Sequence, residues 1–554
     1  MEFQYTKQYL KGYERVLQRF LEIVPGCLSW LILLSATALS ILNPTLAAIF
    51  IIAFYLYWLL RLLYMTLFLA LSYYRLKVEE ETDWMARVEG IDHFAHYLPS
   101  LYQKTKKLTF RQGLSHDIHK KELLVLQSSN SFPPPSNNIY HVVIYPVVKE
   151  SKDIIEPGLK SLSEQKFPAE RMLVVFALED RAPEEIKETI FSLEKKYKQA
   201  FFDILTILHP SDLKGESRVK GANITWAARH TAQFLKEKNI PYENVIVSCF
   251  DADTIVGAHY FSCLTYYFMI SPRRLQSSFQ PIPVYHNNIW EVPAFARVME
   301  CGSSFFQLVE ATNPEKLVTF SSHSMSFKAL VGVDYWPVDM ISDDSAIYWK
   351  SFIHFDGQYD VVPMYVTLSM DIAGSKNFWE TAKSIYHQKR RWAWGVENFP
   401  IVLRAFLKSK KISLYNKLRH GFKLLEGHIS WATWGFLLSF IGWLPALFTH
   451  LEYPGSVIYY NTPRVTATIF RLATISLITS IIISTGLLPK GKKKERLLLT
   501  EKITHALEWL TLPFVLVFFS ALPALDAQTR LMLGRPLQFR VTEKKRKNNL
   551  GTKL

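Results

Sequence analysis

The chain has 554 residues, of which 49% are hydrophobic and 20% charged, and its formal net charge is +15. This length exceeds the usual size of one domain, so we expect a large folded core and a further region. Much of the positive charge lies beside apolar segments, which favours a lipid bilayer over nucleic acid as the partner. Four cysteines without paired spacing fit a reducing cytosol and argue against a disulfide framework or a zinc site.

Residues 1–75 are predicted to form a basic N-terminal helix and a two-helix membrane hairpin. Two apolar stretches, 24–42 and 45–71, are separated by an Asn43-Pro44 turn, and each is long enough to cross about 30 Å of hydrocarbon. Basic residues flank the hairpin on both outer sides, which places both of its ends in the cytosol by the positive-inside rule. These residues are Lys7, Lys11, Arg15, Arg19, Arg75 and Lys77.

Residues 76–138 read as a polar cytosolic helical segment that ends in a Pro-rich linker, 128–138. Beyond the linker, residues 139–398 alternate apolar runs rich in β-branched residues with helical patterns. The expected strands are 141–148, 172–178, 202–208 and 244–250, and the expected helices are 154–165, 183–198, 222–238 and 378–391. This alternation predicts an α/β domain with a mainly parallel sheet covered by helices, in which ligands bind beyond the carboxyl ends of the strands.

Residues 399–427 are amphipathic and basic, so we expect interfacial helices along the membrane surface. The predicted C-terminal membrane region, 428–525, has two spans, 428–448 and 466–488. The second of them precedes the basic residues Lys490, Lys492, Lys493, Lys494 and Arg496.

A further apolar segment, 505–525, precedes a basic tail, 526–554. A third span here would place that tail outside, against the positive-inside rule. A re-entrant or interfacial helix broken near Pro513 and Pro523 is therefore preferred to a third span, with the tail in the cytosol.

The expected strand 244–250 runs directly into Asp251-Ala252-Asp253. Because side chains alternate along an extended chain, both carboxylates are expected on one side, at the edge where a divalent ion bridging a diphosphate would be held. The alternative is an acidic surface turn without a ligand.

A second acidic group is Ser342-Asp343-Asp344, in an apolar context. Adjacent carboxylates can supply a general base, since desolvation and like charge raise a pKa toward neutrality. The alternative is capping, because Ser-Asp-Asp suits the first turn of a helix.

The third element is a set of three side chains on the expected helix 378–391 and its extension. Gln388, Arg391 and Trp392 are spaced i, i+3 and i+4, so they share one face and can present an amide, a guanidinium and an indole to one ligand. A basic helix face near the membrane is the alternative.

In this order and spacing, the three motifs resemble those of the inverting family 2 glycosyltransferases, especially the membrane-integrated cellulose synthase and hyaluronan synthase branch. The resemblance covers about residues 140–395 and extends to the flanking spans. It implies a GT-A-type fold, a Rossmann-like mixed sheet covered by helices, flanked by transmembrane helices.

The resemblance also implies roles. Asp344 falls at the position of the catalytic base, and Asp253, with Asp251, at the metal. The donor-binding positions are Glu150, Asp180, Lys220, Asn223 and Asp251, and the acceptor and diphosphate positions are Asp343, Gln388, Arg391 and Trp392. The stretch 146–150 keeps Glu150 but lacks the hydroxyl and the aromatic ring usual in the family, so UDP is a default for the nucleotide rather than a deduction.

The function expected from the resemblance is transfer of a sugar from a nucleotide-sugar to a growing polysaccharide, with inversion and with Mg2+ or Mn2+, at the cytosolic face of the cell membrane. One alternative is a single addition to a lipid or lipid-linked acceptor. Another is a catalytically silent membrane protein that binds a nucleotide-sugar or scaffolds export. Two segments, 280–283 and 320–326, are expected as polar loops beside the site, with His323 a hydrogen-bonded structural residue.

Overall fold

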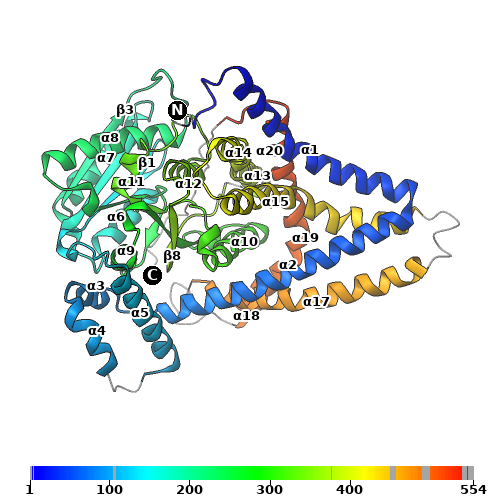
Figure 1. Cartoon of the computed structure of the whole chain (residues 1–554), viewed down its shortest axis with the longest axis horizontal. Coiled ribbons are helices and arrows are strands. Elements are labelled where there is room, and N and C mark those ends of the chain that lie inside the picture. Colours follow the sequence, from blue (N-terminus) through cyan, green and yellow to red (C-terminus); the bar gives the residue numbers. More distant parts are fainter. Residues whose placement is uncertain are drawn as a thin grey trace.

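The computed structural model describes residue 3, residues 5–103, 108–375, 377–448, 457–489 and 499–538, and residue 546. Figure 1 shows an α/β domain on one side and a group of long helices that extends from it on the other. The basic cluster predicted at 490–496 and most of the predicted basic tail lie outside the described residues.

The domain is built on an eight-stranded sheet in the order β3-β2-β1-β4-β7-β6-β8-β5. The first four strands are β1 (Tyr140–Val147), β2 (Met172–Glu179), β3 (Asp203–His209) and β4 (Val245–Cys249), and all four are mutually parallel. The expected strands are thus confirmed to within one or two residues. The sheet as a whole is mixed, because β7 pairs antiparallel with both β4 and β6.

The other half of the sheet differs from the sequence-based expectation. The segment 280–283, expected as a polar loop, lies inside β6 (Ser277–Val284), which is buried throughout, and residues 324–326 of the second expected loop form β7 (Ser324–Ser326). The remaining strands are β5 (Ile255–Val256) and β8 (Asp360–Ser369). Proline lacks an N–H and normally excludes an inner strand. Here the pairing of β6 with β8 shifts register between Gln280 and Ile282, which accommodates Pro281.

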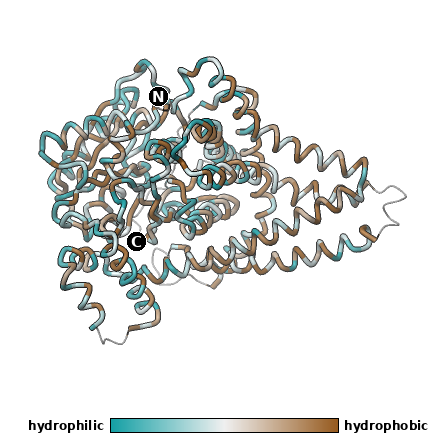
Figure 2. Tube along the Cα trace, in the orientation of Figure 1, coloured by the Kyte–Doolittle hydropathy of each residue, from teal (hydrophilic) through white to brown (hydrophobic). Residues whose placement is uncertain are grey.

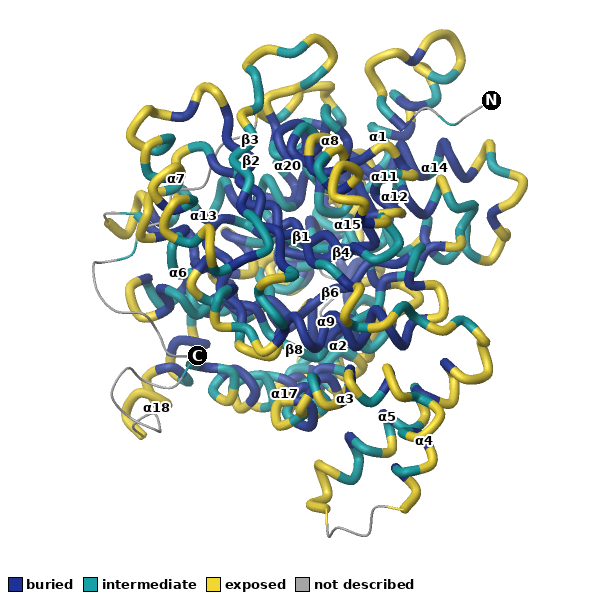
Figure 3. The backbone as a smooth tube through the Cα atoms, turned by 90° about the vertical axis from the view of Figure 1, so that its left-hand side faces the viewer, coloured by how far each residue is buried: buried dark blue, intermediate teal, exposed yellow. Residues whose placement is uncertain are grey.

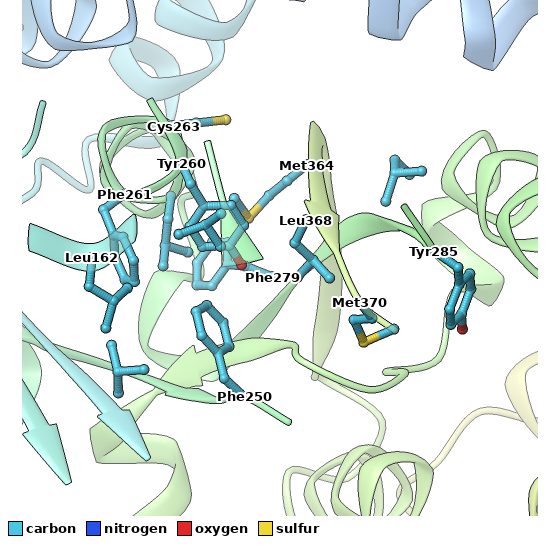
Figure 4. Close-up of a cluster of buried hydrophobic side chains, with 14 of the residues drawn as sticks. Leu162, Phe250, Tyr260, Phe261, Cys263, Phe279, Tyr285, Met364, Leu368 and Met370 are labelled. Carbon is cyan, nitrogen blue, oxygen red and sulfur yellow. The ribbon is translucent and has the colours of Figure 1, made fainter. Parts of the chain in front are cut away.

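Helices cover both faces of the sheet. One face packs against α8 (Lys220–Glu237), α11 (Phe327–Gly332), α12 (Asp343–His354) and α14 (Asn398–Lys408). The other packs against α6 (Lys152–Ser163), α7 (Glu184–Tyr197), α9 (Tyr260–Ile270) and α10 (Ala294–Ala311). Part of this second core, with Leu162, Phe250, Phe261 and Phe279, is drawn in Figure 4. Buried strands enclosed by exposed helices are visible in Figure 3, so the expected α/β architecture is confirmed.

The predicted N-terminal hairpin is present as α1 (Gly12–Leu42) and α2 (Pro44–Glu79). Asn43 separates them, and its side chain accepts a hydrogen bond from the N–H of Leu46 at 3.0 Å, with Pro44 at the first helical position. Both helices and α17 (Val457–Leu487) are long and apolar enough to cross a membrane. Figure 2 shows the hydrophobic residues gathered along these long helices.

The segment between the hairpin and the sheet is helical, as expected. It forms α3 (Trp84–Asp92), α4 (Phe94–Gln103) and α5 (Phe110–Ser129). Thr109 and Gln112 form a capping box at the start of α5, which fixes where that helix begins.

Two C-terminal segments depart from simple spans. The span predicted at 428–448 falls in α15 (Leu414–Ser439) and in the following helical residues Ile441–Leu447, which include α16 (Leu444–Leu447). These two parts are bent by 44°. Residues Leu499–Met532, which include α18 (Leu499–Glu508), α19 (Leu512–Phe514) and α20 (Leu522–Met532), are long and apolar enough for a span. The part from α19 to α20 runs across the direction of α1, α2 and α17 in Figure 1. The re-entrant or interfacial helix expected at 505–525 stays a prediction.

Candidate active site

The two carboxylates that follow β4 have different surroundings. Asp251 accepts hydrogen bonds from the Ser321 hydroxyl at 2.6 Å and from the Lys220 ammonium at 3.0 Å. Asp253 is fully buried and accepts a hydrogen bond from the backbone N–H of Asp371 at 2.7 Å. The predicted acidic pair thus lies at the carboxyl end of a central strand, and each of its side chains meets a different part of the domain.

Lys220 connects the predicted donor site to the predicted base. Its Nζ lies 3.0 Å from Asp251, 3.0 Å from Asp344 and 3.6 Å from Asp343. Burial disfavours the ammonium, but the carboxylates, Asp251 foremost, outweigh it and raise the pKa of Lys220 well above its usual value. One cation therefore compensates three carboxylates that come from two distant stretches of the chain.

Gly221 lets the start of α8 approach this acidic group closely. A Cβ at this position would lie 2.2 Å from the carbonyl oxygen of Pro337 and 3.4 Å from the Cβ of Asp343. Any side chain would force the segments apart, so glycine beside Lys220 sets the geometry of the ion pairs.

The pKa shift expected for the acidic pair falls on Asp343. Its side chain is buried, and this burial, followed by the charge of Asp344, raises the pKa of Asp343 to about 7 in spite of Lys220. The Asp344 side chain keeps 27% of its surface exposed, so a substrate can reach it. The capping alternative is met only in part. Helix α12 begins at Asp343, with Ser342 at the capping position, but the Ser342 hydroxyl donates to Glu397 at 2.8 Å and does not cap the helix.

Glu397 is a residue of this site that sequence reasoning missed. One of its carboxylate oxygens accepts hydrogen bonds from the backbone N–H groups of Ile341 and Ser342, both at 3.2 Å, and the other accepts one from the Trp394 indole at 2.9 Å. Burial raises the pKa of Glu397, an effect that these hydrogen bonds oppose. The sequence shows Glu397 only as a single glutamate among mostly apolar residues after Trp392. This pattern does not indicate which residues it contacts.

The N-terminal segment also reaches the site. The buried Tyr5 hydroxyl donates to the carbonyl oxygen of Ala346 in α12 at 2.9 Å. Asn398, beside Glu397, donates to the hydroxyls of Ser342 at 3.2 Å and Ser345 at 3.0 Å. The turn that presents Asp344 is thus held from two sides by residues with no sequence motif.

The third predicted element also lies at this site, on α13 (Phe378–Ala393). The Trp392 ring meets Phe320 edge to face at 5.4 Å, next to the Ser321 that binds Asp251, and lies 6.3 Å from Tyr285. The charge of Arg391 acts on Asp343 and opposes its pKa rise. Gln388 is buried on the same helix. All three sequence motifs therefore converge, as their order predicts.

Three predicted donor-binding residues have partners within the protein. Asn223 donates to the carbonyl oxygen of Ala177 at 2.7 Å and is buried. Glu150 accepts hydrogen bonds from the N–H groups of Val148 and Lys149 at 2.7 and 2.9 Å, which closes the loop after β1. Asp180, with half its side chain exposed, lies 3.8 Å from Lys187. Their donor roles stay predictions.

The contacts of His323 agree with the interpretation of this residue as a structural histidine. Its Nδ1 lies 3.0 Å from the carbonyl oxygen of Phe320, and burial lowers its pKa to about 4. A neutral imidazole that hydrogen-bonds to the backbone of its own loop stabilises the conformation of that loop.

The residues beside Asp253 have the chemistry of a divalent cation site, although the described part of the chain holds no group of three or more His, Cys, Asp or Glu side chains arranged for a metal. Asp371 is buried, and its backbone bonds the Asp253 carboxylate. The guanidinium of Arg546 pairs with Asp371 at 2.9 Å, so a cation already occupies this place. Carboxylate oxygens are the ligands that Mg2+ and Mn2+ prefer, and the metal role of Asp251 and Asp253 stays a prediction.

The fold and the site together describe one kind of protein. It has an α/β domain with an acidic site at its strand ends, a lysine that compensates this charge, and apolar helices joined to the domain. No protein-family model matches the chain. It is similar to a poly-β-1,6-N-acetyl-D-glucosamine synthase of Staphylococcus epidermidis, with 23% identity over 324 residues, which cover 56% of this chain and 68% of that protein. The chain is thus distantly similar to a polysaccharide synthase.

Two solved structures are also similar. A mannosyltransferase from Pyrobaculum calidifontis, in complex with GDP-Man and Mn2+, aligns at 12% identity and a TM-score of 0.39, over 76% of this chain and 98% of the other. Residues 1–349 of S. aureus TarS, in complex with UDP, align at 11% identity and a TM-score of 0.35, over 74% of this chain and 95% of the other.

Proposed function

We propose that the chain is a membrane glycosyltransferase that transfers a sugar from a nucleotide-sugar to a growing polysaccharide, with inversion and metal assistance, at the cytosolic face. The observation that supports this proposal is the position of Lys220, which ion-pairs with both Asp251, the proposed donor-binding residue, and Asp344, the proposed base. The similarity to a polysaccharide synthase supports the polymer as product.

In the proposed reaction Asp344 removes a proton from the acceptor hydroxyl as that oxygen attacks the anomeric carbon. The bond from this carbon to the diphosphate breaks in the same displacement, and the configuration inverts. Asp344 suits this role because it is the more exposed carboxylate of the pair, whereas Asp343 is buried behind it.

The departing diphosphate needs positive charge, and this chain offers Lys220, which pairs with Asp251, and Arg391, whose charge acts on Asp343. Asp253 and Asp371, with Asp251 beside them, would hold a Mg2+ or Mn2+ ion, which when bound neutralises diphosphate charge. Lys220 can pair with a phosphate oxygen in place of a carboxylate, because its flexible ammonium can donate a hydrogen bond to either group.

The acceptor side is proposed at Trp392. An indole plane suits the apolar face of a sugar ring, and Phe320 and Tyr285 pack against Trp392 and fix its orientation. The adjacent helices α14 and α15, with exposed Leu414, Tyr415 and Phe422 among basic residues, would keep this side at the membrane surface.

The test is a transfer assay on purified protein in lipid with a panel of radiolabelled nucleotide-sugars, Mn2+ and product sizing. We expect polymer from at least one donor, and Asp344→Asn should lower turnover at least about a hundredfold, because general-base catalysis contributes that much. Donor binding, measured by calorimetry, should be retained.

A matched control is Asp334→Asn. This carboxylate is exposed and pairs with Arg229, not with Lys220, so turnover should be unchanged. Normal transfer by Asp344→Asn would contradict the assigned base. Single-sugar products would indicate a lipid or lipid-linked acceptor, and donor binding without transfer by the unchanged protein would indicate a silent binding protein or export scaffold.

A further inference from the structure

Two cations of α13 are not used by the proposed reaction. Lys389 and Arg390 lie between Gln388 and Arg391 in the sequence of this helix. Both form ion pairs with residues far away in the sequence, and the partners lie on two different helices.

Lys389 ties α13 to α10. Its side chain is fully buried, and its Nζ donates to Glu300 at 2.8 Å and to the Ser303 hydroxyl at 3.0 Å. The same nitrogen lies 3.5 Å from the centre of the Trp392 ring. An ammonium in this position attracts the ring face, so the place of Lys389 sets the orientation of the indole.

Arg390 ties α13 to α20. Its Nη1 donates to Asp526 at 2.7 Å, and the Tyr386 hydroxyl, one turn earlier on α13, donates to the same oxygen at 3.1 Å. Asp526 is in turn bonded by Arg530 of α20 at 2.7 Å through its other oxygen. Two successive turns of α13 are therefore fixed to one carboxylate of the C-terminal apolar segment 499–532.

A further ion pair closes a ring of contacts. Arg297, one turn before Glu300 on α10, pairs with Glu508 of α18 through its Nε at 3.0 Å to both carboxylate oxygens. Since α18 and α20 belong to one continuous segment, both helices that hold α13 are connected through it. Figure 1 shows this segment crossing beside α10 and α13.

We propose that Lys389 and Arg390 are positioning residues that fix the predicted acceptor residues Arg391 and Trp392 relative to the C-terminal apolar segment 499–532. The inference rests on the proposed function and deepens it: the place where the acceptor binds is set from the membrane side, through ion pairs with Glu300 and Asp526. Donor-binding residues at the strand ends lie outside this ring.

The test compares Arg390→Gln, Arg390→Lys and Lys389→Gln in the same transfer assay. Both glutamine variants should lower kcat between about tenfold and a hundredfold, since a shift of about 1 Å in a positioned group costs that much. The donor Kd should stay within about twofold, and product length should shorten. Arg390→Lys should recover most of the activity, because one nitrogen makes the contact with Asp526.

The control is Arg530→Gln, which removes another partner of Asp526 without touching α13 and should leave kcat within about twofold. Equal losses in Arg530→Gln and Arg390→Gln, or no recovery in Arg390→Lys with an unchanged thermal midpoint, would overturn the inference. Wild-type kcat in both glutamine variants would also overturn it. An unchanged protein that transfers no sugar would instead contradict the proposed function.

Discussion

The strand-end half and the helix half of the candidate site are built in different ways. At the strand ends, Asp251 and Asp253 follow directly from a buried parallel strand, and the backbone of the sheet fixes where they lie. In the helix half, Asp344, Arg391 and Trp392 stand on α12 and α13, whose positions depend on hydrogen bonds and ion pairs from distant segments. The strands therefore position the side chains of the strand-end half, and polar contacts with residues far away in the sequence position those of the helix half.

This difference has a physical cause. A parallel sheet gathers its strand ends at one edge whatever helices surround it, but a helix on the surface of a sheet can slide or rotate unless specific contacts hold it. Glu397, Glu300 and Asp526 supply such contacts, and all of them are buried or half-buried. The comparison predicts that variants of the helix half change turnover, whereas variants behind the strand ends change stability.

The largest expected effect is that of Lys220→Met, which removes the cation shared by both halves. Asp251, Asp343 and Asp344 would then repel one another at close range, and activity should fall about a thousandfold. Initial transfer rates measure this. Arg229→Met, on an exposed turn of the same helix, is the control and should be close to wild type. Retained activity in Lys220→Met would mean that the two halves work independently.

Next in size is Glu397→Gln, which tests the helix half alone. The neutral amide accepts more weakly from Ile341 and Ser342, so the turn before Asp344 should loosen, with kcat about tenfold lower and the donor KM unchanged. Steady-state kinetics separates the two constants. The exposed Glu243→Gln serves as a matched control. A raised donor KM with normal kcat would contradict this prediction, because it would mean that Glu397 acts on the strand-end half of the site.

A pH series tests the electrostatics of Asp343. Its folded-state pKa, about 7, is raised above the ordinary value of 3.8, so its contribution to stability is present at low pH and is lost as pH rises through about 7. Asp343→Asn, which cannot ionise, should therefore gain thermal stability relative to wild type between pH 5 and pH 8. Unfolding midpoints in detergent measure the difference. A constant difference across that range would contradict a buried, weakly acidic Asp343.

The smallest expected effect is that of Asn223→Ala, which sharpens the strand-end side of the comparison. The change removes the hydrogen bond that Asn223 donates to the carbonyl oxygen of Ala177, which should cost about 1–2 kcal/mol of stability. The donor KM should change less than about twofold. If instead the KM rises tenfold at unchanged stability, the donor role implied by the family resemblance is correct and the hydrogen bond is incidental.

The sequence was sufficient for the strands and helices of the first half of the domain and for the convergence of its three motifs. Runs of β-branched residues and helical patterns are local signals, and the parallel strands β1 to β4 were expected from their alternation. The apolar length of α1, α2 and α17 was equally plain. Strand β6 was missed because its prolines mask a buried strand as a loop.

Only the tertiary structure decided how the site is held. Lys220 meets Asp344 across 124 residues, Tyr5 meets Ala346 across 341, and Lys389 meets Glu300 across 89. No local pattern encodes such pairs, because each residue type is common in a helix and gains meaning only from the partner that folding brings to it. The sequence determined which chemical groups the site contains, and the packing of helices against the sheet determined which of them touch.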